Sequence, residues 1–147
     1  MATGNQTSKL LIVSKVLQAF FIFAVLVYAV ILYAVVPSTG PGVLEDPYLV
    51  NLARWLGIVS LAALAAGYLV PWLVFKWSQP DTHMLFAAYI ARDAFFIAVG
   101  VFGCVLDAFG AGWQITLPFI AASGLSLIIT FPTGGRWRSF MARWEER

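Results

Sequence analysis

The sequence is poor in charged residues, and this scarcity excludes most classes of soluble protein. Only 11% of the 147 residues are charged, whereas 61% are hydrophobic. A soluble domain has about 25% charged and about 45–50% apolar residues, and a soluble fold of this size has too little interior for so many apolar side chains. The composition therefore excludes an ordinary cytosolic enzyme, a disordered chain and a nucleic-acid-binding domain, and it leaves a membrane protein.

Cysteine and histidine are nearly missing, which excludes several kinds of site. The single cysteine, Cys104, has no partner for an internal disulfide, and His83 is the one histidine, too few ligands for a metal or a haem. The sequence also lacks a nucleophile–base arrangement, a phosphate-binding loop and a pair of carboxylates placed for acid–base catalysis. We therefore expect no cofactor, no metal and no enzymatic activity.

Long apolar runs make up most of the chain. A bilayer core about 30 Å thick needs about 20 residues of helix, and only a helix satisfies its own backbone groups in lipid. The sequence therefore predicts an all-α integral membrane protein, with residues 1–135 forming an antiparallel bundle of four transmembrane helices. The expected spans are 10–36, 52–75, 84–109 and 113–131.

The basic residues lie mainly on one side of the expected bundle. With four spans, both ends of the chain and the 76–81 connection share that side, whereas Arg54 lies opposite and Arg92 lies within a span. Because cytoplasmic loops carry an excess of Lys and Arg, we expect a multi-pass protein of the bacterial inner membrane with cytoplasmic N- and C-termini. The basic residues on the cytoplasmic side are Lys9, Lys15, Lys76, Arg136, Arg138, Arg143 and Arg147.

The tail 136–147 has an amphipathic pattern. Its apolar residues recur at i, i+3, i+4 and i+7, which is one face of a helix, and its arginines lie elsewhere around that helix. The pattern predicts a short helix in the cytoplasmic interface, with a frayed tail as the alternative. The residues concerned are Trp137, Phe140, Met141, Trp144, Arg138 and Arg143.

Arg92 and Asp93 are adjacent charges inside the third expected span. A charge there costs about 2.5–3.5 kcal/mol or more unless it is paired or hydrated, so we expect each to have a partner, with Tyr89 one turn before Asp93 as a candidate. One interpretation is a structural ion pair that fixes helix register or a subunit contact. The other is a proton or ion site in which Arg92 tunes Asp93.

The third and fourth expected spans resemble a known group of proteins. The motifs concerned are Tyr89-Ile-Ala-Arg92, Ala94-Phe-Phe-Ile97, Val101-Phe-Gly103, Val105-Leu106, Gly110 and Phe131-Pro132. They resemble small bacterial four-helix membrane proteins of uncharacterised function, which are similar to a doubled rotor-ring hairpin of a rotary ATPase. In that group a glutamate often follows the start of the third helix. The matching position here is Ile97. The resemblance therefore implies the topology, but this chain lacks the ion-carrying acid at that position.

These observations favour a non-catalytic role within an assembly. We expect an accessory or scaffold subunit of a larger inner-membrane complex, respiratory or otherwise energy-transducing, whose partners are other integral membrane subunits and lipids. One alternative is a homo-oligomeric transporter of protons, ions or a small solute that uses Asp93. Another is a lipid- or quinone-binding module with aromatic grooves around Phe95, Phe96 and Phe102.

Overall fold

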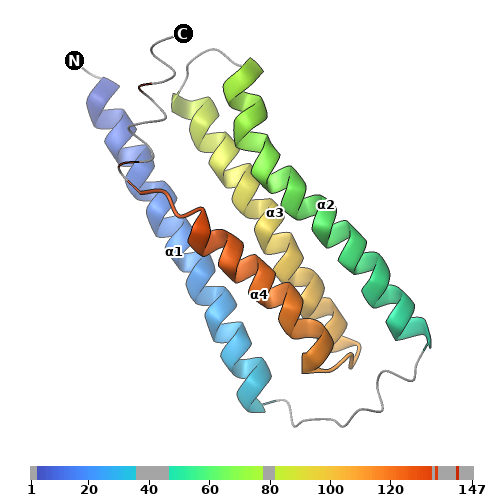
Figure 1. Cartoon of the computed structure of the whole chain (residues 1–147). Helices are drawn as coiled ribbons and strands as arrows, with labels where there is room; N and C mark the ends of the chain where they lie inside the picture. Colours follow the sequence, from blue (N-terminus) through green and yellow to red (C-terminus); the bar gives the residue numbers. More distant parts are fainter. Residues whose placement is uncertain (1–2, 36–46, 78–81, 134, 136–141, 143–147) are drawn as a thin grey trace.

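The described part of the chain is helical. A computed structural model describes residues 3–35, 47–77, 82–133, 135 and 142. Within these ranges the chain has no strand, and successive helices run in opposite directions (Figure 1). The helices are α1 (Thr3–Val35), α2 (Pro47–Trp77), α3 (Thr82–Ala108) and α4 (Trp113–Ile129).

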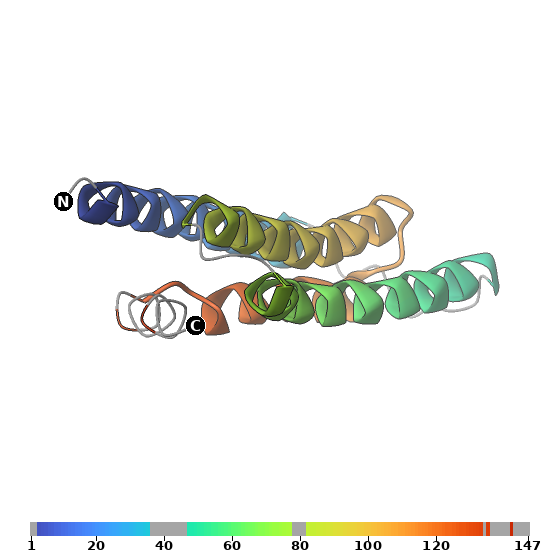
Figure 2. The same cartoon turned by 90° about the horizontal axis from the view of Figure 1, so that it is seen from above.

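Helix α3 is the centre of the arrangement. It packs along α2 on one side and along α4 on the other, and it also touches α1. Seen from above, α1 and α3 lie in one layer and α2 and α4 in the second (Figure 2). Helix α1 packs mainly against α4, while α2 packs chiefly against α3. A side chain of α3 can therefore meet groups from every other helix.

Three of the helices are long and apolar enough to cross a membrane. Their apolar parts are Lys9–Ile31, Pro47–Trp77 and His83–Ala108. Helix α4 is apolar but has only 17 residues, which at about 1.5 Å per residue gives about 25 Å. It is therefore shorter than each of the other three, and its C-terminal end lies beside the middle part of its neighbours (Figure 1).

The helix ends differ from the expected spans. Helix α1 begins at Thr3 instead of residue 10, and α2 begins at Pro47 instead of residue 52. Proline is favourable in the first turn of a helix, where its missing N–H costs nothing. The expected starts differ because they were placed where the apolar residues begin. Helix α4 ends at Ile129, two residues before the expected end. The six residues of the expected interfacial tail helix lie outside the described residues.

Two glycines make the tight connection between α3 and α4. Gly110 has φ +79° and Gly112 has φ +72°, values that side chains with a Cβ rarely adopt. Gly112 is the N-cap of α4, and no side chain caps that end. Asp107, near the end of α3, therefore does not cap α4. Its carboxylate Oδ2 accepts a hydrogen bond from the Tyr28 hydroxyl at 3.2 Å instead.

Candidate functional site: a polar cluster at the end of α4

The charged residues inside α3 form an ion pair with each other. Both Nε and Nη2 of Arg92 donate to Oδ1 of Asp93, at 3.0 and 2.8 Å. The two residues are only 5% and 2% exposed. The guanidinium Cζ lies 4.4 Å from the centre of the Tyr89 ring, one turn earlier on α3. The ring supplies a cation–π contact, so Arg92 is held by a carboxylate and by an aromatic face.

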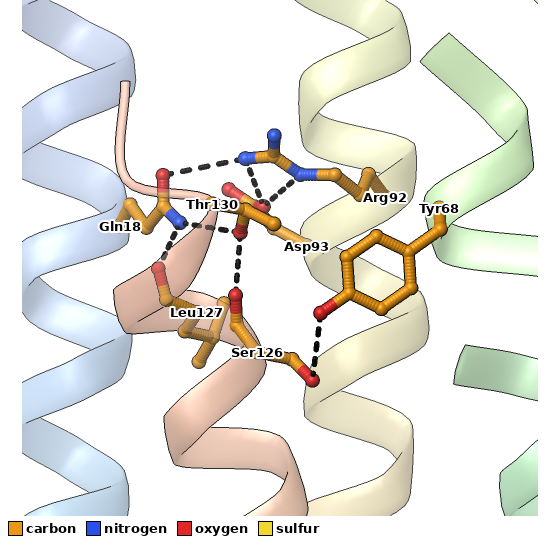
Figure 3. Close-up of polar contacts among 7 residues, drawn as sticks. All are labelled: Gln18, Tyr68, Arg92, Asp93, Ser126, Leu127 and Thr130. Carbon is orange, nitrogen blue, oxygen red and sulfur yellow. Dashed lines mark hydrogen bonds and ion pairs between the residues drawn. The ribbon is translucent and has the colours of Figure 1, made fainter. Parts of the chain in front are cut away.

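Gln18 of α1 connects this pair to α4. Its Oε1 accepts a hydrogen bond from Nη2 of Arg92 at 3.4 Å. Its Nε2 donates to the backbone oxygen of Leu127 at 2.7 Å and to Oγ1 of Thr130 at 3.3 Å. The residue is fully buried. One amide therefore joins three helices through its acceptor and its donor (Figure 3).

The cluster satisfies the C-terminal end of α4. The last carbonyls of a helix have no partner within it, and in lipid no water replaces one. The Leu127 carbonyl accepts a hydrogen bond from the Gln18 amide. The Ile128 carbonyl accepts one from the backbone N–H of Phe131 at 3.2 Å. The Ser126 carbonyl accepts the Thr130 backbone N–H at 3.1 Å and the Thr130 hydroxyl at 2.6 Å. The end of α4 is therefore capped from inside the bundle.

Tyr68 extends the cluster to α2. Its hydroxyl donates to Oγ of Ser126 at 3.5 Å, and its ring packs 5.0 Å from the ring of Phe96. Tyr68 is 48% exposed, whereas Phe96 is completely buried. All four helices thus contribute a polar side chain, and Figure 3 shows these side chains gathered around the last turn of α4.

The residues singled out from the sequence as an ion pair and its partner lie together in this cluster, but the sequence analysis missed Gln18. Arg92, Asp93 and Tyr89 come together, with Arg92 over the Tyr89 ring. Gln18 was not singled out, although it is as central as the ion pair. The signal lies in the spacing of Ser14 and Gln18, which are four residues apart in an apolar run and are both buried. Such spacing places both on one face of a helix.

The aromatic residues proposed for a lipid or quinone groove do not share one environment. Phe96 is fully buried and lies against α2, where a Cβ on Gly67 would come within 2.6 Å of its ring. Phe95 is 37% exposed. Phe96 is therefore a packing residue between α2 and α3 and does not line an open groove with Phe95.

The arrangement is suited to holding helices together. The opposite charges lie side by side, and the Gln18 amide has an acceptor and a donor as neighbours. The described residues contain no group of three His, Cys, Asp or Glu side chains that would hold a metal ion. A fully satisfied buried network rigidifies and specifies a packing arrangement. The hydrogen bonds of the cluster therefore hold α1, α3 and α4 together.

Similarity to known proteins contributes no further candidate. Comparisons of the chain with protein-family models, with curated proteins and with solved structures find no match. The functional interpretation therefore rests on the contacts described above.

Proposed function

We propose that the chain is a non-catalytic accessory or scaffold subunit of a larger inner-membrane complex. The observation that carries this proposal is that the buried charges are bonded within the chain itself, at the end of α4. Catalytic and transport sites usually leave a polar group facing a pocket or a water-filled path. Here the polar groups stabilise the fold, so the outer surface is where the chain acts.

The proposal includes the finer topology. We infer that α4, with Thr130 and Phe131 continuing it, is a fourth span of an antiparallel bundle, and that both termini are cytoplasmic. The asymmetry of Lys and Arg supports this orientation. The capped end of α4 supports its placement within the membrane, because a helix end at membrane depth needs internal hydrogen-bond partners.

The outer face of α2 is the proposed partner surface. Helix α2 packs chiefly against α3, so its opposite side is open. Ala62 and Ala65 are exposed there, and small residues let a second helix approach closely. Large side chains surround them, which is typical of an anchor surface. The outer face of α2 consists of Ile58, Leu61, Ala62, Ala65, Leu69 and Trp72, all exposed.

Gentle detergent extraction followed by native electrophoresis tests the proposal. The native chain should migrate as a larger particle with other membrane polypeptides. Ala65→Leu should release it, because the added bulk blocks close helix approach. Ala19→Leu, an equal change at an exposed position of α1, is the control and should leave the particle intact. Migration of the native chain as a free protomer without companions would contradict the proposal.

A homo-oligomeric transporter that uses Asp93 is the second candidate. It is supported by the line of polar groups that leads from half-exposed Tyr68 through Ser126, Thr130 and Gln18 to the ion pair. Proton flux into liposomes tests it, with Asp93→Asn as the decisive variant. Flux with the native chain that Asp93→Asn abolishes would favour this function. We expect no flux with either chain, because Arg92 already neutralises Asp93.

A further inference from the structure

An apolar cleft of about 180 Å³ lies between α1 and α3, and none of the residues of the polar cluster lines it. Ala24 and Tyr28 of α1 face Gly100, Val101 and Cys104 of α3 across it, and Ile120 of α4 also lines it. Its walls are almost entirely carbon. Small residues, Ala24 and Gly100 among them, form part of its lining.

The cleft has no free polar group to attract a charged or strongly polar ligand. The Tyr28 hydroxyl, the most polar atom of the lining residues, donates its hydrogen to Asp107 at 3.2 Å. A quinone would need a strong donor directed at its carbonyl oxygens, and the walls offer only the weak donor of the Cys104 thiol. The chemistry of the walls therefore selects hydrocarbon.

The mouth of the cleft is continuous with the apolar outer surface of α1 and α3. Ala24 and Val101 form part of the walls and are themselves exposed, as are Phe23 and Val27 beside them. Both helices are apolar enough to cross a membrane, so lipid chains adjoin this surface. An apolar cavity that is left empty loses dispersion contacts along its walls.

We propose that this cleft is a binding site for one hydrocarbon chain of a membrane phospholipid. An apolar cavity of about 150 Å³ holds a benzene-sized group, so a cleft of about 180 Å³ takes a segment of an acyl chain. The site goes beyond the scaffold function and depends only on membrane placement. It also differs from the grooves expected around Phe95, Phe96 and Phe102, since none of these lines it.

Photo-crosslinking in vesicles tests the site. The full chain is reconstituted with a phospholipid that carries a photoactivatable diazirine in the middle of one acyl chain, and the adducts are mapped by mass spectrometry. We expect adducts on Cys104 and Tyr28 inside the cleft. Ala24→Leu should fill the cleft and reduce these adducts several-fold. Ala87→Leu, the same change at an exposed position of α3 away from the cleft, should leave them unchanged.

Val101→Ala gives a second test because it enlarges the cleft without adding bulk. It should increase the adducts on Cys104 and Tyr28. Equal adducts on these residues in the native chain, Ala24→Leu and Val101→Ala would overturn the proposal. So would adducts confined to outward residues such as Phe23. Efficient oxidative cross-linking between Cys104 of two chains would also overturn it, since a second copy would then occupy the cleft.

This outcome is separate from that of the scaffold proposal. Loss of the larger particle in native electrophoresis concerns the outer face of α2, whereas acyl-chain adducts concern the seam between α1 and α3. Either result can fail while the other holds.

Discussion

Arg92 and Asp93 follow one another on α3, where successive side chains point about 100° apart around the helix. The long arginine side chain nevertheless turns back, and two of its nitrogens reach one carboxylate oxygen. Desolvation makes each of these charges costly on its own, and a buried pair is stable only when its remaining donors and acceptors find partners. Gln18 and the Tyr89 ring supply such partners.

Removing the arginine should therefore destabilise the fold more than removing both charges. Arg92→Met leaves the carboxylate of Asp93 without its cation, and we expect a loss of about 3–5 kcal/mol. Arg92→Met combined with Asp93→Leu should recover much of that loss. Unfolding in mild detergent titrated with a denaturing detergent measures the free energies. Arg54→Met, at an exposed position of α2, is the control.

A double variant as unstable as Arg92→Met alone would contradict this account. It would mean that the pair does more than neutralise itself inside α3.

The hydrogen bond from Gln18 to Leu127 gives the second prediction at this scale. Gln18→Leu keeps the size of the side chain but removes the donor for a helix-end carbonyl. We expect a loss of about 0.6–1.7 kcal/mol, the upper half of what polar contacts between membrane helices contribute. The same unfolding titration measures it. Gln114→Leu, an exposed glutamine at the start of α4, should change stability little, and an equal effect of both substitutions would refute the role of Gln18.

Among the elements, α4 explains why a polar cluster exists at all. It is 17 residues long, whereas α1 has 33 and α3 has 27. Because it starts at a tight turn directly after α3, it ends beside the middle part of α3 instead of beside the start of α3 (Figure 1). The carbonyls of its last turn thus need partners within the bundle, and Gln18 and Thr130 provide them.

Two glycine-to-alanine substitutions, one in the turn between α3 and α4 and one inside α2, should change the free energy of unfolding in opposite directions. Gly110→Ala places a Cβ on a backbone with φ +79° and should cost about 1–2 kcal/mol, the penalty of the left-handed region. Gly57→Ala should instead stabilise by about 0.5–1 kcal/mol, because Gly57 is inside α2 and a Cβ there meets no atom within 4 Å. The free energies of unfolding of both variants check this prediction. If both substitutions stabilised the protein, or both destabilised it, the different roles given to these two glycines would be contradicted.

The sequence predicted the existence of the helices better than it predicted their ends or their contacts. Long apolar runs allow little other than helices in lipid, so all four helices were expected. Hydropathy could not show that α2 begins at Pro47 or that α4 ends at Ile129. Gln18 was overlooked because one polar residue in an apolar run gives no sign of which helix it faces. Its acceptor, Leu127, is 109 residues away.

At the scale of the whole molecule, α3 is more buried than α1 and α2, which present apolar surfaces. Leu85, Phe96 and Leu106 of α3 are completely buried, whereas Phe20, Phe23 and Val30 of α1 are each more than 60% exposed. A patch of exposed apolar surface this large marks a lipid or protein interface. The proposed partner surface on α2 and the proposed acyl-chain cleft between α1 and α3 therefore use different sides of the same molecule.

The proposed orientation gives a prediction for the molecule as a whole. Tyr48→Cys and Trp77→Cys, each combined with Cys104→Ser, place one reactive thiol near either end of α2, where both native residues are exposed. A membrane-impermeant maleimide should label Tyr48→Cys in intact spheroplasts and Trp77→Cys only after lysis. This follows from the excess of basic residues on the Trp77 side. The reverse pattern would invert the orientation, and labelling of both in intact spheroplasts would contradict α2 as a membrane span.

The bond between Gln18 and Leu127 also has a consequence for biosynthesis. Its two ends are separated by 109 residues, and a ribosome that adds about 5–20 residues per second needs roughly 5–20 s to make that stretch. During this time the amide of α1 has left the ribosome but its final acceptor has not yet been translated. The nascent chain must therefore keep Gln18 close to water, to the translocon or to a chaperone until α4 emerges.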